Sequence, residues 1–164
     1  YAYFSVSTQV PELTFDFQIP ENRGQQDVTW KEKIKGITIN QRFQVEERFI
    51  HNSNNRSLLD GTTFFWRFRY RLMGDYNFWE KEDRKLKLIV YDEIMFNAGK
   101  NIVYNTFDQN RIYFGVQYGN ENLAVELGYL KSFQQRPNGT DYFNRDIIRL
   151  SIFHKINCIK KNSD

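Results

Sequence analysis

The sequence predicts an all-β fold in which one antiparallel sheet of long strands runs up and down. Three observations predict it. Apolar and polar residues alternate with a period of two, which is the period of a strand and not of a helix. Phe, Tyr and Trp make up 17% of the chain, whereas Pro and Gly number only 3 and 9. The 164 residues suffice for a single domain over residues 1–164.

The first predicted strand is the apolar and aromatic run from Tyr1 to Ser7. Residues 18–36 follow as a predicted loop, because Pro20, Gly24 and Gly36 are spread among many charges. Within this loop the sequence suggests a short helix over residues 27–35 that Asp27 caps.

The next two predicted strands cover residues 37–50 and 64–72. In the first, Phe43 and Val45 share one face, and Arg42, Gln44, Glu46 and Arg48 share the other. The second is the clearest in the chain: Trp66, Phe68, Tyr70 and Leu72 alternate with Arg67, Arg69 and Arg71. A helix would scatter these residues around its circumference, whereas a strand separates them completely.

Four further strands are predicted over residues 86–97, 110–118, 123–133 and 147–156. The strand over residues 86–97 has a mixed pattern and contains Glu93. The apolar faces of the other three carry Ile112, Phe114, Val116, Leu127, Tyr129 and Leu150. Their polar faces carry Arg111, Tyr113, Gly115, Glu126, Gly128 and Arg149. Residues 118–122 form a predicted hairpin turn, and residues 52–56 and 136–140 form predicted polar loops.

Composition excludes several classes of protein. The 23 basic and 20 acidic residues leave a net charge of only +3, and the arginines lie across the sheet from the rings, so we expect no nucleic-acid partner. Cys158 is the only cysteine, which excludes an internal disulfide and a cysteine zinc site. No apolar run reaches the roughly 18 residues of a membrane helix. With two histidines, we expect no metal and no cofactor.

Three architectures can cover a sheet with one apolar face: a soluble sandwich, a soluble barrel with an apolar interior, and a membrane barrel with its apolar face toward lipid. The large rings on the apolar face, the glycines on the polar face and the mixed charges favour the membrane barrel, in which arginines and carboxylates can pair inside. Glu47 and Asp92 fall on the apolar faces and oppose this assignment. A half-exposed soluble sheet stays open as an alternative.

The membrane barrel assigns each face a role. The predicted charge network inside the barrel is Arg42, Glu46, Arg48, Arg67, Arg69, Arg71, Glu93, Arg111, Glu126 and Arg149. The predicted lipid-facing residues are Phe43, Val45, Trp66, Phe68, Tyr70, Ile112, Phe114, Val116, Leu127, Tyr129 and Leu150. Such long charged side chains should fill a narrow barrel, so we expect a plugged or very narrow interior.

No catalytic group emerges from the sequence. Ser151 and His154 are three residues apart on one strand, so their side chains point to opposite faces and cannot form a dyad. Arg67, Arg69 and Arg71 could bind an anionic ligand, but a structural ladder with Glu46 is the favoured interpretation. We therefore expect no enzyme.

Six segments in order resemble a family of Bacteroidota outer-membrane β-barrels that is classified only as a domain of unknown function. They are residues 21–23, 42–49, 67–72, 91–97, 108–115 and 126–130. The resemblance implies an integral outer-membrane barrel of a Gram-negative bacterium, truncated at its N-terminus, with about seven of roughly ten strands visible.

The expected function is thus that of a non-enzymatic outer-membrane barrel of unknown physiological role. Its expected partners are outer-membrane lipid and, for an envelope structural role, another envelope protein. Two alternatives stay open: a soluble periplasmic barrel that binds an apolar ligand, and a lipid hydrolase acting at the barrel rim.

Overall fold

The computed structural model describes residues 1–6, 17–54, 56–136 and 138–156, and over these ranges the chain forms strands and no helix. The strands are β1 (Ala2–Val6), β2 (Ile19–Ile34), β3 (Ile37–Ser53), β4 (Leu58–Lys81), β5 (Arg84–Ala98), β6 (Phe107–Gly119), β7 (Leu123–Gln135) and β8 (Tyr142–His154). They form one eight-stranded sheet in chain order, and each consecutive pair is antiparallel. The all-β, up-and-down fold is confirmed.

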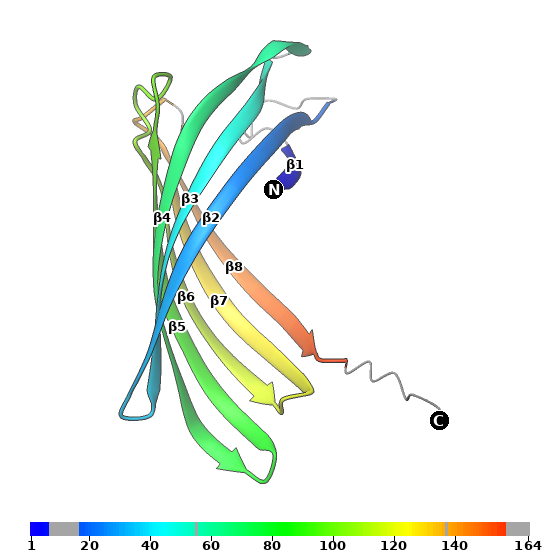
Figure 1. The fold of residues 1–164 in the computed structure, drawn as a ribbon, viewed down its shortest axis with the longest axis vertical. Helices are drawn as coiled ribbons and strands as arrows, with labels where there is room; N and C mark the ends of the chain where they lie inside the picture. Colours follow the sequence, from blue (N-terminus) through cyan, green and yellow to red (C-terminus); the bar gives the residue numbers. More distant parts are fainter. Residues whose placement is uncertain (7–16, 55, 137, 157–164) are drawn as a thin grey trace, which may run out of the picture.

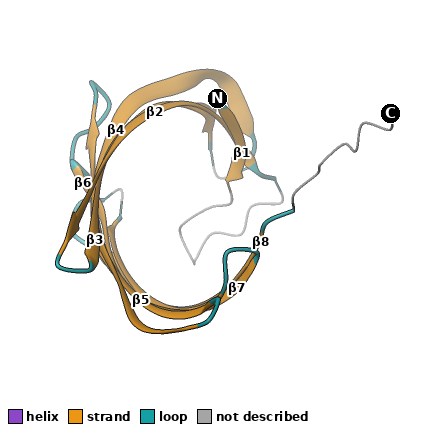
Figure 2. Ribbon diagram, turned by 60° about the horizontal axis from the view of Figure 1, so that its bottom comes forward, coloured by secondary structure: helices purple, strands orange, loops and turns teal. Residues whose placement is uncertain are grey.

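The sheet curls into part of a barrel (Figure 1). Seen along the curl, the strands follow an incomplete ring (Figure 2). In the described ranges β1 and β8 are the two edges of the sheet, and no ladder joins them. The described residues contain no helix that is long and apolar enough to cross a membrane.

The predicted loop and short helix over residues 18–36 are wrong, because β2 occupies this segment and pairs with β3 from Glu21↔Ile50 to Ile34↔Ile37. Most side chains of β2 are charged or polar, and such a composition is typical of a loop. Gly24 has a packing role: a Cβ there would lie 3.1 Å from Oε2 of Glu47 on β3. The described residues therefore form eight strands where the sequence predicted seven.

The two ends of the sheet differ. At one end β2–β3, β4–β5 and β6–β7 are joined by short turns, and at the other end the connections after β5 and β7 span residues 99–106 and 136–141 (Figure 1). Lys35 and Gly36 both have positive φ, 47° and 87°, as a two-residue type I′ hairpin turn requires. In the predicted hairpin turn, the side chain of Asn120 accepts hydrogen bonds from the backbone N–H groups of Asn122 and Leu123.

Several strands are longer than predicted, because backbone pairing continues beyond the residues in which apolar and polar side chains alternate. β4 covers 24 residues and pairs with β5 as far as Lys81↔Arg84. β8 begins at Tyr142 because it pairs there with Gln135 of β7. Ser7 of the first predicted strand and Cys158 lie outside the described residues.

The two faces of the sheet have opposite character. Most of its buried residues are polar or charged, and its exposed residues include large aliphatic and aromatic side chains from every strand. Because the side chains of a curled sheet converge on its inner side, the buried set marks the concave face and the exposed apolar set marks the convex face (Figure 2). Met95 and Tyr113, 1% and 0% exposed, are the most buried hydrophobic side chains described.

Candidate functional site: an ion-pair network on the concave face

Charged side chains from β2 to β6 meet on the concave face. We call this set the concave network; its members are Glu21, Arg23, Arg42, Glu46, Arg48, Arg67, Arg69, Glu93, Asp108 and Arg111. The strands place them there because each occupies a position of the same parity in the pleat, apart from Asp108 at an irregularity between β5 and β6. Seven of the ten were predicted from sequence in this role together with Arg71, Glu126 and Arg149.

Glu46 is the centre of the concave network. It is 0% exposed, and three arginines surround it, with N···O distances of 2.7 Å to Arg69, 3.3 Å to Arg23 and 3.8 Å to Arg67. The amide of Gln44 donates a further hydrogen bond of 2.9 Å. A buried carboxylate is tolerated only when it is paired and hydrogen-bonded, and Glu46 meets both conditions.

Glu93 on β5 links the next layer. Arg69 on the adjacent β4 donates to Glu93 at 2.9 Å and to Glu46 at 2.7 Å, so one guanidinium bridges two carboxylates. Arg42 reaches from β3 across β4 to Glu93 at 2.6 Å. Arg111 lies at the edge of this group, 3.9 Å from Glu93. The geometry holds three strands together through side chains in addition to the backbone ladder.

Arg71 differs from its neighbours. It is aligned with Arg42 on β3 and Glu93 on β5, yet within the described residues it makes no ion pair. Its guanidinium lies over the ring of Tyr91 at 5.7 Å from the centroid. Arg71 is therefore the one member of the predicted charge set that the described ranges leave without a carboxylate partner.

Two further groups close the ends of the network. Arg48 binds Glu21 through two nitrogens, at 2.6 Å and 2.7 Å, and Arg23 lies 2.7 Å from the same carboxylate. Arg67 pairs with Asp108 on β6 at 2.9 Å. The bidentate arrangement at Glu21 fixes orientation as well as charge.

A second, smaller group lies on β6, β7 and β8. The hydroxyl of Tyr113 donates to Glu126, Arg149 pairs with Glu126 at 2.7 Å, and the Arg149 guanidinium lies 4.3 Å from the Tyr113 ring centroid. Tyr113 extends over the cross-strand pair Gly115 and Gly128. A Cβ would lie 2.5 Å and 2.0 Å from the Tyr113 hydroxyl at these two positions, so both glycines are required for the ring to lie flat.

The eleven residues predicted to face lipid lie on the convex face. Seven are exposed, namely Phe43, Phe68, Ile112, Phe114, Leu127, Tyr129 and Leu150, and the other four are half-buried among them. The two exceptions noted in the sequence, Glu47 and Asp92, also lie on this face. Glu47 folds against Gly24, and Asp92 accepts a hydrogen bond from Asn110.

A family model identifies the family of this chain but not its activity. The family model described as Protein of unknown function (DUF2490) matches residues 1–144. The chain belongs to the DUF2490 family. No curated protein and no solved structure is similar enough to count as a match.

Sequence reasoning missed four residues of this DUF2490 chain that make central contacts. Glu21 and Arg23 fall in the predicted loop over residues 18–36, Asp108 lies just before the strand predicted over residues 110–118, and Tyr113 was placed on a polar face without a further role. Tyr113 carried a usable signal, since an aromatic residue beside two strand glycines on the polar face marks a ring that needs their space. Asp108 carried none, because its orientation depends on the irregular pairing near Phe96.

The DUF2490 chain brings together no nucleophile and base in the groups described above. On β8, Ser151 is on the concave face beside Glu126, whereas His154 is on the opposite face. Over the described ranges no three His, Cys, Asp or Glu residues gather as metal ligands would. The arrangement on the concave face pairs carboxylates with arginines and joins strands.

Proposed function

We propose that this chain forms the larger part of an integral β-barrel of the outer membrane of a Gram-negative bacterium, from the Bacteroidota, and that it is not an enzyme. Its role would be structural in the envelope or in association with an envelope partner. The convex face would contact lipid, and the concave face would enclose the barrel interior.

One observation carries this proposal: the sheet exposes its apolar face and buries its charged face. A soluble barrel that binds an apolar ligand needs the opposite arrangement, with aliphatic and aromatic side chains inside. A transmembrane barrel needs an outward apolar band and a polar interior. Exposed Phe43, Phe68, Phe114 and Leu127 on one face, with Glu46 at 0% exposure on the other, fit the second requirement.

Among the described residues β1 and β8 have no strand on their outer sides, which supports a larger barrel. An unpaired strand edge in hydrocarbon leaves backbone N–H and C=O groups without partners, at a cost of several kcal/mol each, so strands cross membranes only in closed barrels. The proposal therefore requires further strands that join β1 to β8, in agreement with the roughly ten strands that the family resemblance implies.

The concave network determines what such a barrel can conduct. Ten charged side chains, most of them in contact with one another, occupy the interior wall of β2 to β6. In a barrel of roughly ten strands, such side chains reach far into the lumen. The proposed barrel is plugged or very narrow and does not act as a general porin.

The proposal also orients the chain. Outer-membrane barrels have short turns on the periplasmic side and longer loops on the outer side. The short turns at Lys35-Gly36, Glu82-Asp83 and residues 120–122 would therefore face the periplasm. Residues 99–106 and 136–141 would face outward.

Membrane fractionation of cells that express the full-length protein tests the proposal. We expect the protein in the outer-membrane fraction, resistant to extraction by carbonate and urea, soluble in detergent, and faster in SDS gels before boiling than after. A marker outer-membrane barrel and a periplasmic protein from the same cells provide the controls. Recovery in the soluble periplasmic fraction without detergent would contradict the proposal.

A further inference from the structure

A carboxylate lies in the middle of the apolar convex face. From Leu86 to Phe96 the convex side chains of β5 are, in order, Leu86, Leu88, Val90, Asp92, Ile94 and Phe96. Leu72 on β4 and Ile112 on β6 are directly opposite Asp92 on the neighbouring strands. If this face contacts lipid, as proposed above, a charge at this depth is costly, and an ionisable residue in such a position is a marker of function.

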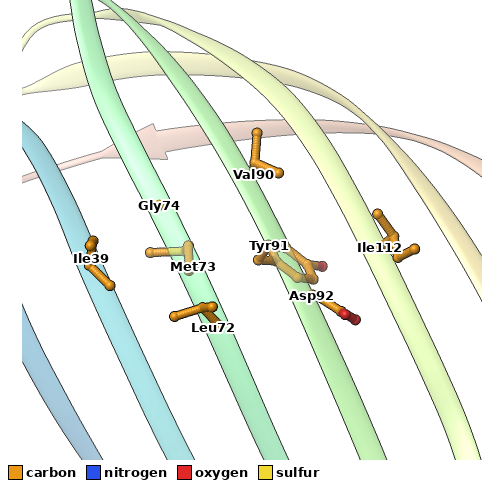
Figure 3. A pocket seen from close by; sticks show the side chains of 8 residues that line it. All are labelled: Ile39, Leu72, Met73, Gly74, Val90, Tyr91, Asp92 and Ile112. Carbon is orange, nitrogen blue, oxygen red and sulfur yellow. The ribbon is translucent and has the colours of Figure 1, made fainter.

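A hollow lies next to this carboxylate on the same face. It has a volume of about 450 Å³, and its apolar walls include Ile39, Leu72, Val90 and Ile112 (Figure 3). The hollow exists because position 74 lacks a side chain: a Cβ at Gly74 would meet only Cγ2 of Ile37, at 4.0 Å. The backbone at Gly74 does not require glycine, since its φ is not in the left-handed region.

The polar pair at the hollow is incompletely satisfied. Asn110 on β6 donates one amide hydrogen to Asp92. Its amide has a second N–H, which has no partner among the residues described, and the Asp92 carboxylate has further lone pairs. A donor and an acceptor therefore lie side by side in an apolar surrounding, where a polar group without a hydrogen bond costs free energy.

We propose that this region, the Asp92 patch (Leu72, Gly74, Val90, Asp92, Asn110 and Ile112), is the contact between two copies of this chain in the membrane. A donor beside an acceptor is self-complementary under a twofold rotation, because each donor then faces the acceptor of the other copy. An axis between Asp92 and Asn110 lets each Asn110 amide bridge both carboxylates. Apolar walls of one copy fill the hollow over Gly74 of the other.

A lipid chain is a weaker candidate for the same patch. An acyl chain can fill the hollow, but it offers no hydrogen-bond donor to Asp92 at this depth. A membrane protein of another kind would need a cation or a donor aimed at Asp92, whereas a second copy supplies that donor from Asn110 itself. The self-complementarity of the patch favours the second copy.

Cysteine cross-linking in native membranes tests the inference, which rests on the proposed function. Every native cysteine of the full-length protein, Cys158 included, is replaced by Ser, and Ile112→Cys is introduced in the wall of the hollow, where Ile112 is 52% exposed. Leu150→Cys on β8 is the control, because Leu150 is 66% exposed on the same convex face but lies away from the patch. We expect a cross-linked band of twice the mass from Ile112→Cys and none from Leu150→Cys.

Two additional variants locate the contact. Gly74→Leu fills the hollow from within, and Asp92→Leu removes the carboxylate and leaves an apolar row on β5. Each should lower the cross-linked fraction about tenfold, as expected for a residue at the centre of an interface. Unboiled gel mobility should stay that of the folded barrel, which separates loss of contact from loss of fold.

Three results would overturn the inference. The first is a folded, membrane-embedded Ile112→Cys protein that gives no cross-link. The second is a cross-linked band whose mass is not twice that of the protein. The third is a cross-linked fraction that neither Gly74→Leu nor Asp92→Leu lowers. The proposed function has a separate readout in the same samples. Absence of the protein from the membrane fraction would overturn the proposed function, and the inference would fall with it.

Discussion

Replacement of Glu46 by glutamine tests the concave network at its centre. Glu46→Gln keeps the size of the side chain and removes its charge. The three arginines around it, Arg23, Arg67 and Arg69, would then share a buried site with no carboxylate at its centre, since their side chains are only 12% to 16% exposed. Arg67 and Arg69 would keep Asp108 and Glu93, and Arg23 would keep Glu21.

The magnitude follows from the three distances. At N···O separations of 2.7, 3.3 and 3.8 Å and an effective dielectric constant of about 20, each pair attracts by about 4 to 6 kcal/mol before the cost of desolvation is subtracted. Loss of one partner from a buried ion pair destabilises proteins by about 3 to 5 kcal/mol. We expect the free energy of unfolding to fall by that amount in Glu46→Gln.

Urea titration of the full-length protein in lipid vesicles or detergent, followed by heat-modifiable gel mobility, measures this change. Glu47→Gln is the matched control, because Glu47 is the next residue, has the same chemistry and lies on the opposite face against Gly24. Its effect should stay within about 1 kcal/mol, as for a charge without a described ion pair. Equal effects of the two substitutions would refute the reasoning that charge is buried on one face only.

Three further predictions follow from the same geometry. Arg71→Gln should change the free energy of unfolding by less than about 1 kcal/mol. Arg69→Gln breaks contacts to two carboxylates and should lower the free energy of unfolding by about 3 kcal/mol or more. A larger effect of Arg71→Gln than of Arg69→Gln in urea titrations would contradict the network. Gly128→Ala should destabilise by about 1 to 3 kcal/mol, because its Cβ would lie 2.0 Å from the buried tyrosine hydroxyl; an unchanged urea midpoint would show that the ring is free to move. An epitope inserted in residues 99–106 should bind antibody on intact cells, whereas one in the Glu82-Asp83 turn should not; the opposite labelling would invert the proposed orientation.

The period-two alternation predicted most of the fold. In residues 66–72 apolar and charged side chains alternate without interruption, so both the strand and its faces could be assigned. In β2 the same period was hidden, since Glu21 and Arg23 alternate with Asn22 and Gly24 and no apolar face is visible there. Their partners on β3 become apparent only when the register of the hairpin is known.

The pairing of the charged residues could not be predicted in the same way. The sequence shows that Arg42 and Glu93 prefer the same face, but their contact spans β4 and depends on the register of two hairpins and on the curvature of the sheet. Asp108 turns toward Arg67 only because the β5–β6 ladder is irregular nearby. Such contacts follow from three-dimensional register, which composition and periodicity leave undetermined.

Quenching of tryptophan fluorescence tests the central claim most directly, because Trp30, Trp66 and Trp79 account for all three tryptophans and all lie on the convex face. A full-length protein in which every tryptophan except Trp66 is replaced by Phe, Trp30 and Trp79 included, is reconstituted in vesicles of brominated phospholipid. The account predicts strong quenching by bromine on the acyl chains and little by aqueous iodide. Strong quenching by iodide with none by brominated lipid would place Trp66 in water and contradict a lipid-facing convex surface.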